Sequence, residues 1–139
     1  MSALAVTVVA LAVTPALAAG GGPVKGAKYT GSSGPGYPLS FKVSADGKAV
    51  DNLVVAYLST CQPGAGDTAP KFHFGTLAIK DRKFSGTSTD NFFGKTESDK
   101  VHISGTFSGR DATGNLSDLA HIKSLPNCTD HSPFTAKAK

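Results

Sequence analysis

The stretch LSFKVSADGKAVDNLVVAYL, residues 39–58, contains the clearest structural signal in the chain. Its first half alternates apolar and polar residues, which is the period of a strand with one buried face. Asp46 and Gly47 follow, and both tolerate the positive φ that a type I′ turn requires. Pairing outward from this turn sets Val43 against Val50 as a buried apolar pair. The stretch therefore predicts a β-hairpin around which the other strands are organised.

The pairing of this hairpin also predicts an irregularity. Lys42 should face Asp51 across the strands as an exposed pair of opposite charges. One step further along the strands, Phe41 would face the polar Asn52. An extra residue near Asn52, a β-bulge, would return Leu53 to the face of Phe41. We therefore expect a bulge in the second strand.

Beyond the expected bulge, residues 53–58 read LVVAYL and are apolar on both faces. Strands of this composition are usually covered on both sides. We therefore expect a central strand here that runs toward Cys61. Residues 31–38 and 62–70 contain several glycines and prolines, which predicts irregular loops.

The remainder of the chain repeats the strand pattern, with turn signals roughly every ten residues. In residues 71–80 the buried parity changes at Gly75, which predicts a bulge or bend. Residues 133–139 are expected to form a last edge strand, protected by outward-facing lysines. These segments predict an all-β fold, a single antiparallel β-sandwich or small meander barrel of about eight or nine strands. The other expected strands are residues 27–30, 83–90, 101–107 and 115–123, the last of which could also form a helical turn.

Residues 1–18 have the features of a secretory signal peptide, with an apolar run, a proline and small residues before the cleavage position. The run is shorter than the roughly 18 to 20 residues that a membrane-spanning helix needs. We therefore expect a secreted or extracytoplasmic protein with no stable membrane insertion after cleavage. Residues 19–26 are expected to form a flexible leader, and residues 27–139 the all-β domain.

The chain contains two cysteines, Cys61 and Cys128. An exported chain meets an oxidising compartment, where two cysteines most simply form one disulfide. No motif around either cysteine supports a role in metal binding or nucleophilic catalysis. We therefore expect a disulfide between them.

The charges indicate which partners the domain could meet. The formal net charge is +4, and a mild positive excess favours approach to anionic surfaces such as cell-wall polymers or lipid headgroups. The lysines are scattered, as on ordinary solvated strand faces. Because no basic run is interleaved with aromatic residues, nucleic acid is not expected as a partner.

Histidines and carboxylates offer a catalytic alternative. If separate strands brought His73, His102 and His121 together, they could hold a metal, because neutral imidazole is a common zinc or copper ligand. Ordinary surface positions explain these histidines more simply, and His131 is a fourth. The carboxylates fall mainly at turns, where Asp is favoured, and no G-x-S-x-G segment occurs. We therefore expect neither a catalytic residue nor a cofactor, and we favour a non-catalytic role.

The candidate binding surface is formed by Tyr37, Phe92 and Phe93, together with the glycine-rich loops. An exposed pair of phenylalanines would mark a contact patch, whereas a buried pair would fill the core. Residues 62–70 offer a different possibility, since a loop presented by Cys61 could act as the reactive segment of a protein inhibitor.

Short motifs occur along the chain: YTG at 29–31, FKVSADGK at 41–48, FSG at 84–86 and 107–109, and FTAK at 134–137. Together with one cysteine after the long strand and another before the last, this set resembles a family of small exported bacterial all-β domains of uncharacterised function. The resemblance covers nearly all of the chain after the signal peptide. It implies an all-β fold and export, and it transfers no active site.

The leading hypothesis is a secreted, disulfide-stapled β-domain that acts as a non-catalytic binding or structural module at the cell envelope or outside the cell. Its partner would be a cell-wall polymer or an extracellular protein. The alternatives are a protein inhibitor of a secreted hydrolase and a small hydrolytic or metal-dependent enzyme.

Overall fold

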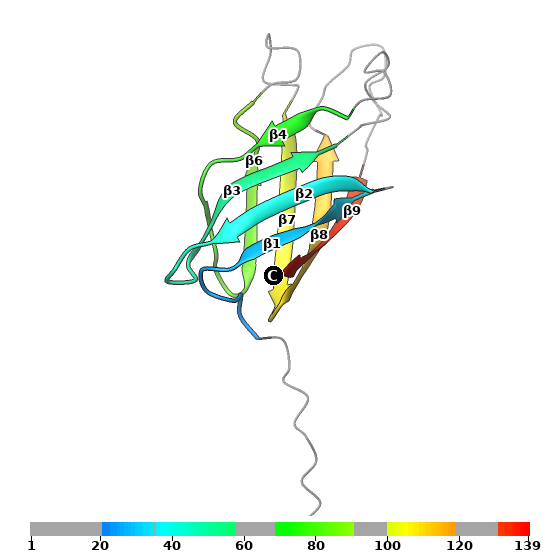
Figure 1. Ribbon diagram of the computed structural model, residues 1–139. Coiled ribbons are helices and arrows are strands. Elements are labelled where there is room, and N and C mark those ends of the chain that lie inside the picture. The colour runs from blue at the N-terminus through cyan, green and yellow to red at the C-terminus, as the bar shows by residue number, and fades with distance from the viewer. Residues whose placement is uncertain (1–20, 35, 58–68, 91–99, 119–130) are drawn as a thin grey trace, which may run out of the picture.

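The computed structural model describes residues 21–34, 36–57, 69–90, 100–118 and 131–139. Within these residues the chain is all β, and its nine strands belong to one curled antiparallel sheet (Figure 1). No helix among them is long and apolar enough to cross a membrane. The strands are β1 (Lys28–Ser33), β2 (Tyr37–Val43), β3 (Ala49–Ala56), β4 (Lys71–His73), β5 (Leu77–Ala78), β6 (Lys83–Thr87), β7 (Val101–Ser108), β8 (Asp111–Asp118) and β9 (His131–Ala138).

The sheet is a meander whose first and last strands are neighbours. Its strand order is β4-β3-β2-β1-β9-β8-β7-β6, and β5 pairs with β3 beside this path. Strands β1 to β3 cross in front of β6 to β8, so the sheet wraps around a core as a half-barrel (Figure 1). The expectation of an edge strand at the C-terminus is wrong, because β9 pairs with both β1 and β8.

The β2–β3 hairpin confirms the predicted register and bulge. Val43 pairs with Val50, and the register shifts between Ser40 and Lys42, so that β3 contains one extra residue. Asn52 lies in this bulge with a φ of 52°. Because of the extra residue, Leu53 returns to the core and is fully buried.

The turn of this hairpin differs from the expected type I′ geometry. Only Gly47 has a positive φ, of 77°, and its N–H donates to the carbonyl of Ser44. The Asp46 carboxylate accepts hydrogen bonds from the Ser44 hydroxyl and the Lys48 N–H. Asp46 therefore needs no left-handed backbone, because its side chain holds the loop instead.

Two other expectations from the sequence need correction. Strand β1 continues through Gly31 to Ser33 and β2 begins at Tyr37, so the irregular loop predicted at 31–38 is much shorter. Glycine is required at position 31 of this strand, because a Cβ there would lie 1.8 Å from the Thr135 carbonyl oxygen of β9. The outward face of β3 is covered only in part, since Ala56 is buried but Val54 remains partly exposed.

Aromatic side chains fill the interior of the curled sheet. The ring of Tyr29 stacks on Phe41 at a centroid distance of 5.0 Å and meets the edge of Phe107 at 5.3 Å. Phe84 lies 5.3 Å from Phe107 and 6.3 Å from Phe134. All five rings are buried. Buried aromatic rings in stacked and edge contacts stabilise the interior of the sheet.

A pair of glycines makes room for two of these rings. Gly105 of β7 faces Gly114 of β8, and the pair lies between Phe84 and Phe134 in register. A Cβ at Gly105 would lie 2.5 Å from the Phe84 ring, and one at Gly114 would lie 1.9 Å from the Ser104 carbonyl oxygen. The sheet can therefore curl tightly here only because neither residue has a side chain.

The two ends of the sheet meet where β4 approaches the residues after β6, a contact we call the seam. The Thr89 N–H and hydroxyl both donate to the His73 carbonyl, at 2.8 and 3.1 Å. In return, the His73 N–H donates to Oδ2 of Asp90 at 3.0 Å. As expected, the 71–80 segment is interrupted around Gly75, which separates β4 from β5.

Candidate functional site

The binding residues predicted from the sequence are only partly described. Tyr37 is half-buried at the start of β2. Phe92 and Phe93 lie outside the described residues, as do Cys61 and Cys128 and most of the 62–70 loop. The expected aromatic patch, disulfide and reactive segment therefore remain predictions.

The histidines lie on different strands. His73 is on β4, His102 on β7 and His131 on β9, while His121 lies outside the described residues. No group of three metal-ligating side chains occurs in the part of the chain that the structure describes. His102 instead lies 3.5 Å from the Thr87 hydroxyl across the β6–β7 pair.

His73 has a structural partner at the seam. Its Nδ1 lies 2.5 Å from Oδ2 of Asp90 and donates to it, because the carboxylate can only accept. Partial burial raises the pKa of Asp90, but hydrogen bonds from the His73 ring, the His73 N–H and the Thr89 hydroxyl outweigh it and hold the pKa below its ordinary value. This arrangement stabilises the contact between the two ends of the sheet.

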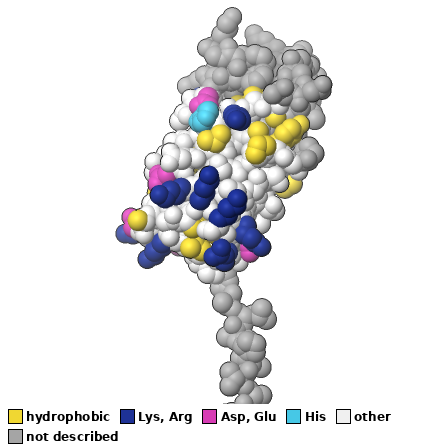
Figure 2. All heavy atoms as spheres, in the orientation of Figure 1, with side chains coloured by type: hydrophobic (Ala, Val, Ile, Leu, Met, Phe, Trp, Pro, Cys, Tyr) yellow, Lys and Arg dark blue, Asp and Glu magenta, His cyan; other side chains and the backbone are white. Residues whose placement is uncertain are grey.

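Lysines gather on the outer surface of the lower half of the sheet (Figure 2). Lys28 and Lys42 are direct neighbours across β1 and β2, and both are exposed. The Lys139 N–H donates to the Lys28 carbonyl, which extends the group to the C-terminus. We call this surface the basic face, and it consists of Lys25, Lys28, Lys42, Lys48, Arg110, Lys137 and Lys139.

Most of the positive charge on the basic face is not neutralised by neighbouring acids. In the described residues the one ion pair on this face joins Lys137 to Asp111 at 3.6 Å, with both side chains largely exposed. Asp51 faces Lys42 in register but accepts a hydrogen bond from the Thr76 hydroxyl at 2.8 Å.

The remaining acid at this end, Asp46, is held by the hairpin loop. A hydrogen bond from the Ser44 hydroxyl lowers its pKa, and one from the Lys48 N–H lowers it further. Asp46 therefore stays ionised, and its oxygen acceptors are used by its own turn. The ammonium groups of Lys28 and Lys42 are left for a partner.

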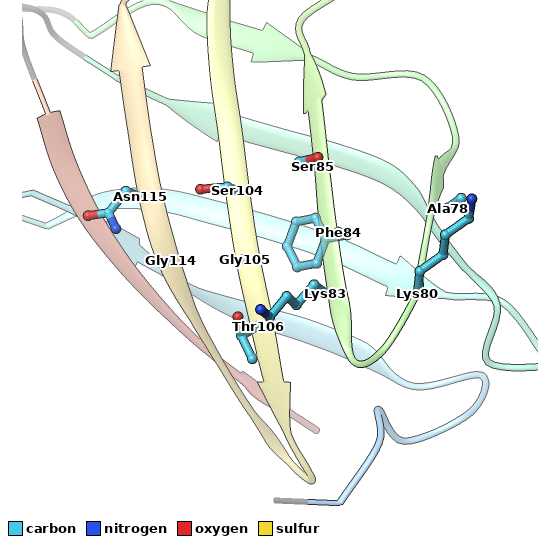
Figure 3. A pocket seen from close by; sticks show the side chains of 10 residues that line it. All are labelled: Ala78, Lys80, Lys83, Phe84, Ser85, Ser104, Gly105, Thr106, Gly114 and Asn115. Atoms are coloured by element: carbon cyan, nitrogen blue, oxygen red, sulfur yellow. The ribbon is translucent and has the colours of Figure 1, made fainter.

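A second surface lies on the outer side of β6, β7 and β8. It is an open groove of about 630 Å³ whose floor includes Phe84, Gly105 and Gly114. Figure 3 shows hydroxyl, amide and ammonium groups rising from the three strands around it. We call it the hydroxyl groove, and its polar lining residues are Lys80, Lys83, Ser85, Ser104, Thr106 and Asn115.

No protein-family model matches the chain, and no curated protein matches it. The function must therefore be argued from the chemistry of these two surfaces. Sequence reasoning missed both of them, because each is assembled from strands that are distant in the chain. The alternation of outward lysines with inward apolar residues was visible, but it did not reveal which strands are neighbours.

Proposed function

We propose that the protein is an exported, non-catalytic binding module, stapled by a disulfide between Cys61 and Cys128, that attaches to an anionic polymer of the cell envelope through the basic face. The observation that supports this proposal is the adjacency of Lys28 and Lys42 without an ion-pair partner among the described residues. The expected export, the resemblance to exported domains and the net charge of +4 agree with it.

The geometry of the basic face suits a polymer with repeated negative charges. Neighbouring strands lie roughly 4.8 Å apart, so Lys28 and Lys42 hold two ammonium groups close together on a rigid support. Lys42, Lys28 and Lys137 stand on the adjacent strands β2, β1 and β9, and together they form a continuous path across the sheet. A polyanion can contact several of these charges at once, which strengthens the attraction and speeds association.

Co-sedimentation with isolated cell-envelope polymers tests this function. The unaltered protein should sediment with the anionic polymer fraction at low salt. The double substitution Lys28→Glu with Lys42→Glu should weaken this binding by about ten-fold or more, because it replaces attraction by repulsion at the centre of the face.

A matched control carries the same change in charge elsewhere. Lys71→Glu with Lys100→Glu alters two lysines outside the basic face and should leave most of the binding intact. If the two double variants bind equally well, or if the unaltered protein stays in the supernatant with every anionic fraction, the proposed function is wrong.

A further inference from the structure

We infer that the hydroxyl groove is a binding site for a short acidic sugar chain, a chain of hydroxyl-bearing rings that carries a carboxylate. This site is separate from the basic face and does not depend on the proposed function. At about 630 Å³, the groove falls within the range of roughly 300 to 1,000 Å³ that is usual for small-ligand sites.

The strand register arranges the polar side chains of the groove in rows. Ser85, Ser104 and Asn115 face one another across β6, β7 and β8. Lys83 faces Thr106 in the next row along the strands. Neighbouring side chains within a row are separated by the distance between two adjacent strands, and these rows lie on regularly paired strands. The groove therefore presents a fixed array of groups and needs little ordering when a ligand binds.

These side chains are free to bind. Ser85, Ser104, Thr106 and Asn115 form no side-chain hydrogen bond with the protein within the described residues. Each hydroxyl can donate and accept, and the amide of Asn115 offers two donors and an acceptor. Sugar hydroxyls have the same dual character, so such an array matches a polyhydroxylated ligand along its length.

The charge at one rim selects an acidic ligand. Lys80 and Lys83 flank the tight turn that joins β5 to β6, and their backbone groups pair with each other. Both side chains are exposed, and neither has an ion-pair partner in the part of the chain that the structure describes. Asp81 lies in the turn between them without pairing with either. Two unpaired ammonium groups beside a hydroxyl array favour a carboxylate on the sugar.

The floor of the groove explains why a ring can approach. Phe84, Gly105 and Gly114 are inward-facing positions of their strands, so on the outer side of the sheet they present mainly backbone, which keeps the floor low between the polar side chains. In Figure 3 the Lys83 ammonium lies beside Thr106, whereas the Lys80 side chain extends toward Ala78 on the other side of Phe84. A sugar ring could lie over this strip with its carboxylate toward Lys83, the lysine beside Thr106.

Nuclear magnetic resonance titration of the full chain with a uronic-acid trisaccharide tests this inference. We expect shifts of the amide signals of Ser85, Ser104, Thr106 and Asn115. Lys80→Glu with Lys83→Glu should weaken binding by about ten-fold. A neutral trisaccharide of equal length should bind more weakly than the acidic one, and inorganic phosphate alone should produce only small shifts.

A second variant covers the case in which charge reversal disrupts the turn. Ser104→Ala with Asn115→Ala changes only exposed side chains and should weaken binding by about five-fold through lost hydrogen bonds. The inference is overturned if the acidic trisaccharide leaves the groove signals unmoved, if phosphate produces the same shifts, or if both variants bind as tightly as the unaltered chain. The basic-face variant Lys28→Glu with Lys42→Glu should bind the trisaccharide normally. Failure of the groove inference can therefore be distinguished from failure of the proposed function.

Discussion

Strands β7 and β8 are paired along their whole length, with eight residue pairs in register from Val101 to Ser108. The seam between β4 and the end of β6 is held mainly by side chains and backbone groups of His73, Thr89 and Asp90. The first region is stabilised by a backbone ladder over a buried aromatic core, and the second by hydrogen bonds to one backbone carbonyl and one partly exposed carboxylate. Changes within the ladder should therefore cost much more stability than changes at the seam, and the seam should weaken in acid below the ordinary carboxyl pKa of about 4.

Gly114→Val should have the largest effect. A Cβ at this position would meet the Ser104 carbonyl oxygen at 1.9 Å and the Phe134 ring at 2.6 Å, so the strands must separate or the ring must move. We expect a loss of about 3 kcal/mol or more in the free energy of unfolding, measured by urea denaturation. The control Thr113→Val lies on the exposed side of the same strand and should change stability by about 0.5 kcal/mol at most.

Tyr29→Phe should have the next largest effect in the ladder region. The Tyr29 hydroxyl donates to the Gly109 carbonyl at 2.7 Å and accepts from the Val24 N–H at 2.9 Å. Its removal leaves both backbone groups without this partner, which should cost about 1 to 2 kcal/mol in thermal or urea unfolding. Tyr37→Phe is a suitable comparison, since Tyr37 is half-buried. Equal losses in both variants would contradict the role assigned to the Tyr29 hydroxyl.

Gly47→Val should weaken the β2–β3 hairpin by about 1 kcal/mol, because a β-branched residue is strained at the φ of 77° that Gly47 adopts. Ala45→Val, two residues earlier and exposed, has no such strain and should be nearly neutral. Both are measured by urea denaturation. Unchanged stability in Gly47→Val would show that the turn tolerates another backbone conformation.

Asp90→Asn should have the smallest effect, about 1 kcal/mol or less, because the Asp90 side chain is 35% exposed and solvent screens its interaction with His73. Hydrogen exchange should nevertheless become faster at the Thr89 amide than at the β7 and β8 amides, since the seam opens locally. Similar acceleration in both regions would mean that the seam and the ladder unfold together.

The seam should also depend on pH in a defined direction. Because the pKa of Asp90 is lowered in the folded protein, its contribution is fully present above the ordinary carboxyl pKa of about 4. It is lost as the pH falls through the lower, folded-state pKa. The stability difference between the unaltered protein and Asp90→Asn should therefore shrink in this acid range. A difference that stays constant down to the lowest pH at which the protein folds would exclude this contribution.

Local patterns in the sequence were enough to predict the strands and one hairpin. Alternation and charge pairing placed Val43 opposite Val50, and the polar Asn52 at a buried position predicted the bulge. The prediction of a type I′ turn at Asp46 and Gly47 is wrong. Asp81 and Arg82, with φ values of 49° and 64°, form the two-residue turn with positive φ, whereas Asp46 uses its side chain to close a longer loop.

The long-range arrangement could not be predicted in the same way. The tail residues alternate as an edge strand would, and nothing local indicates that β9 inserts between β1 and β8. That insertion brings Lys139 next to Lys28 and completes the basic face. The hydroxyl groove likewise requires Gly105 and Gly114 to be neighbours, which follows from register between strands and not from either segment alone.

The most direct test of the proposed function is the salt dependence of binding to an anionic envelope polymer, measured in parallel for the unaltered protein and for Lys28→Glu with Lys42→Glu. Screening weakens exposed charge interactions as ionic strength rises. We predict that the affinity of the unaltered protein falls steeply with added salt, and that the weaker binding of the variant changes little. Equal salt dependence in both proteins would contradict a function carried by the basic face.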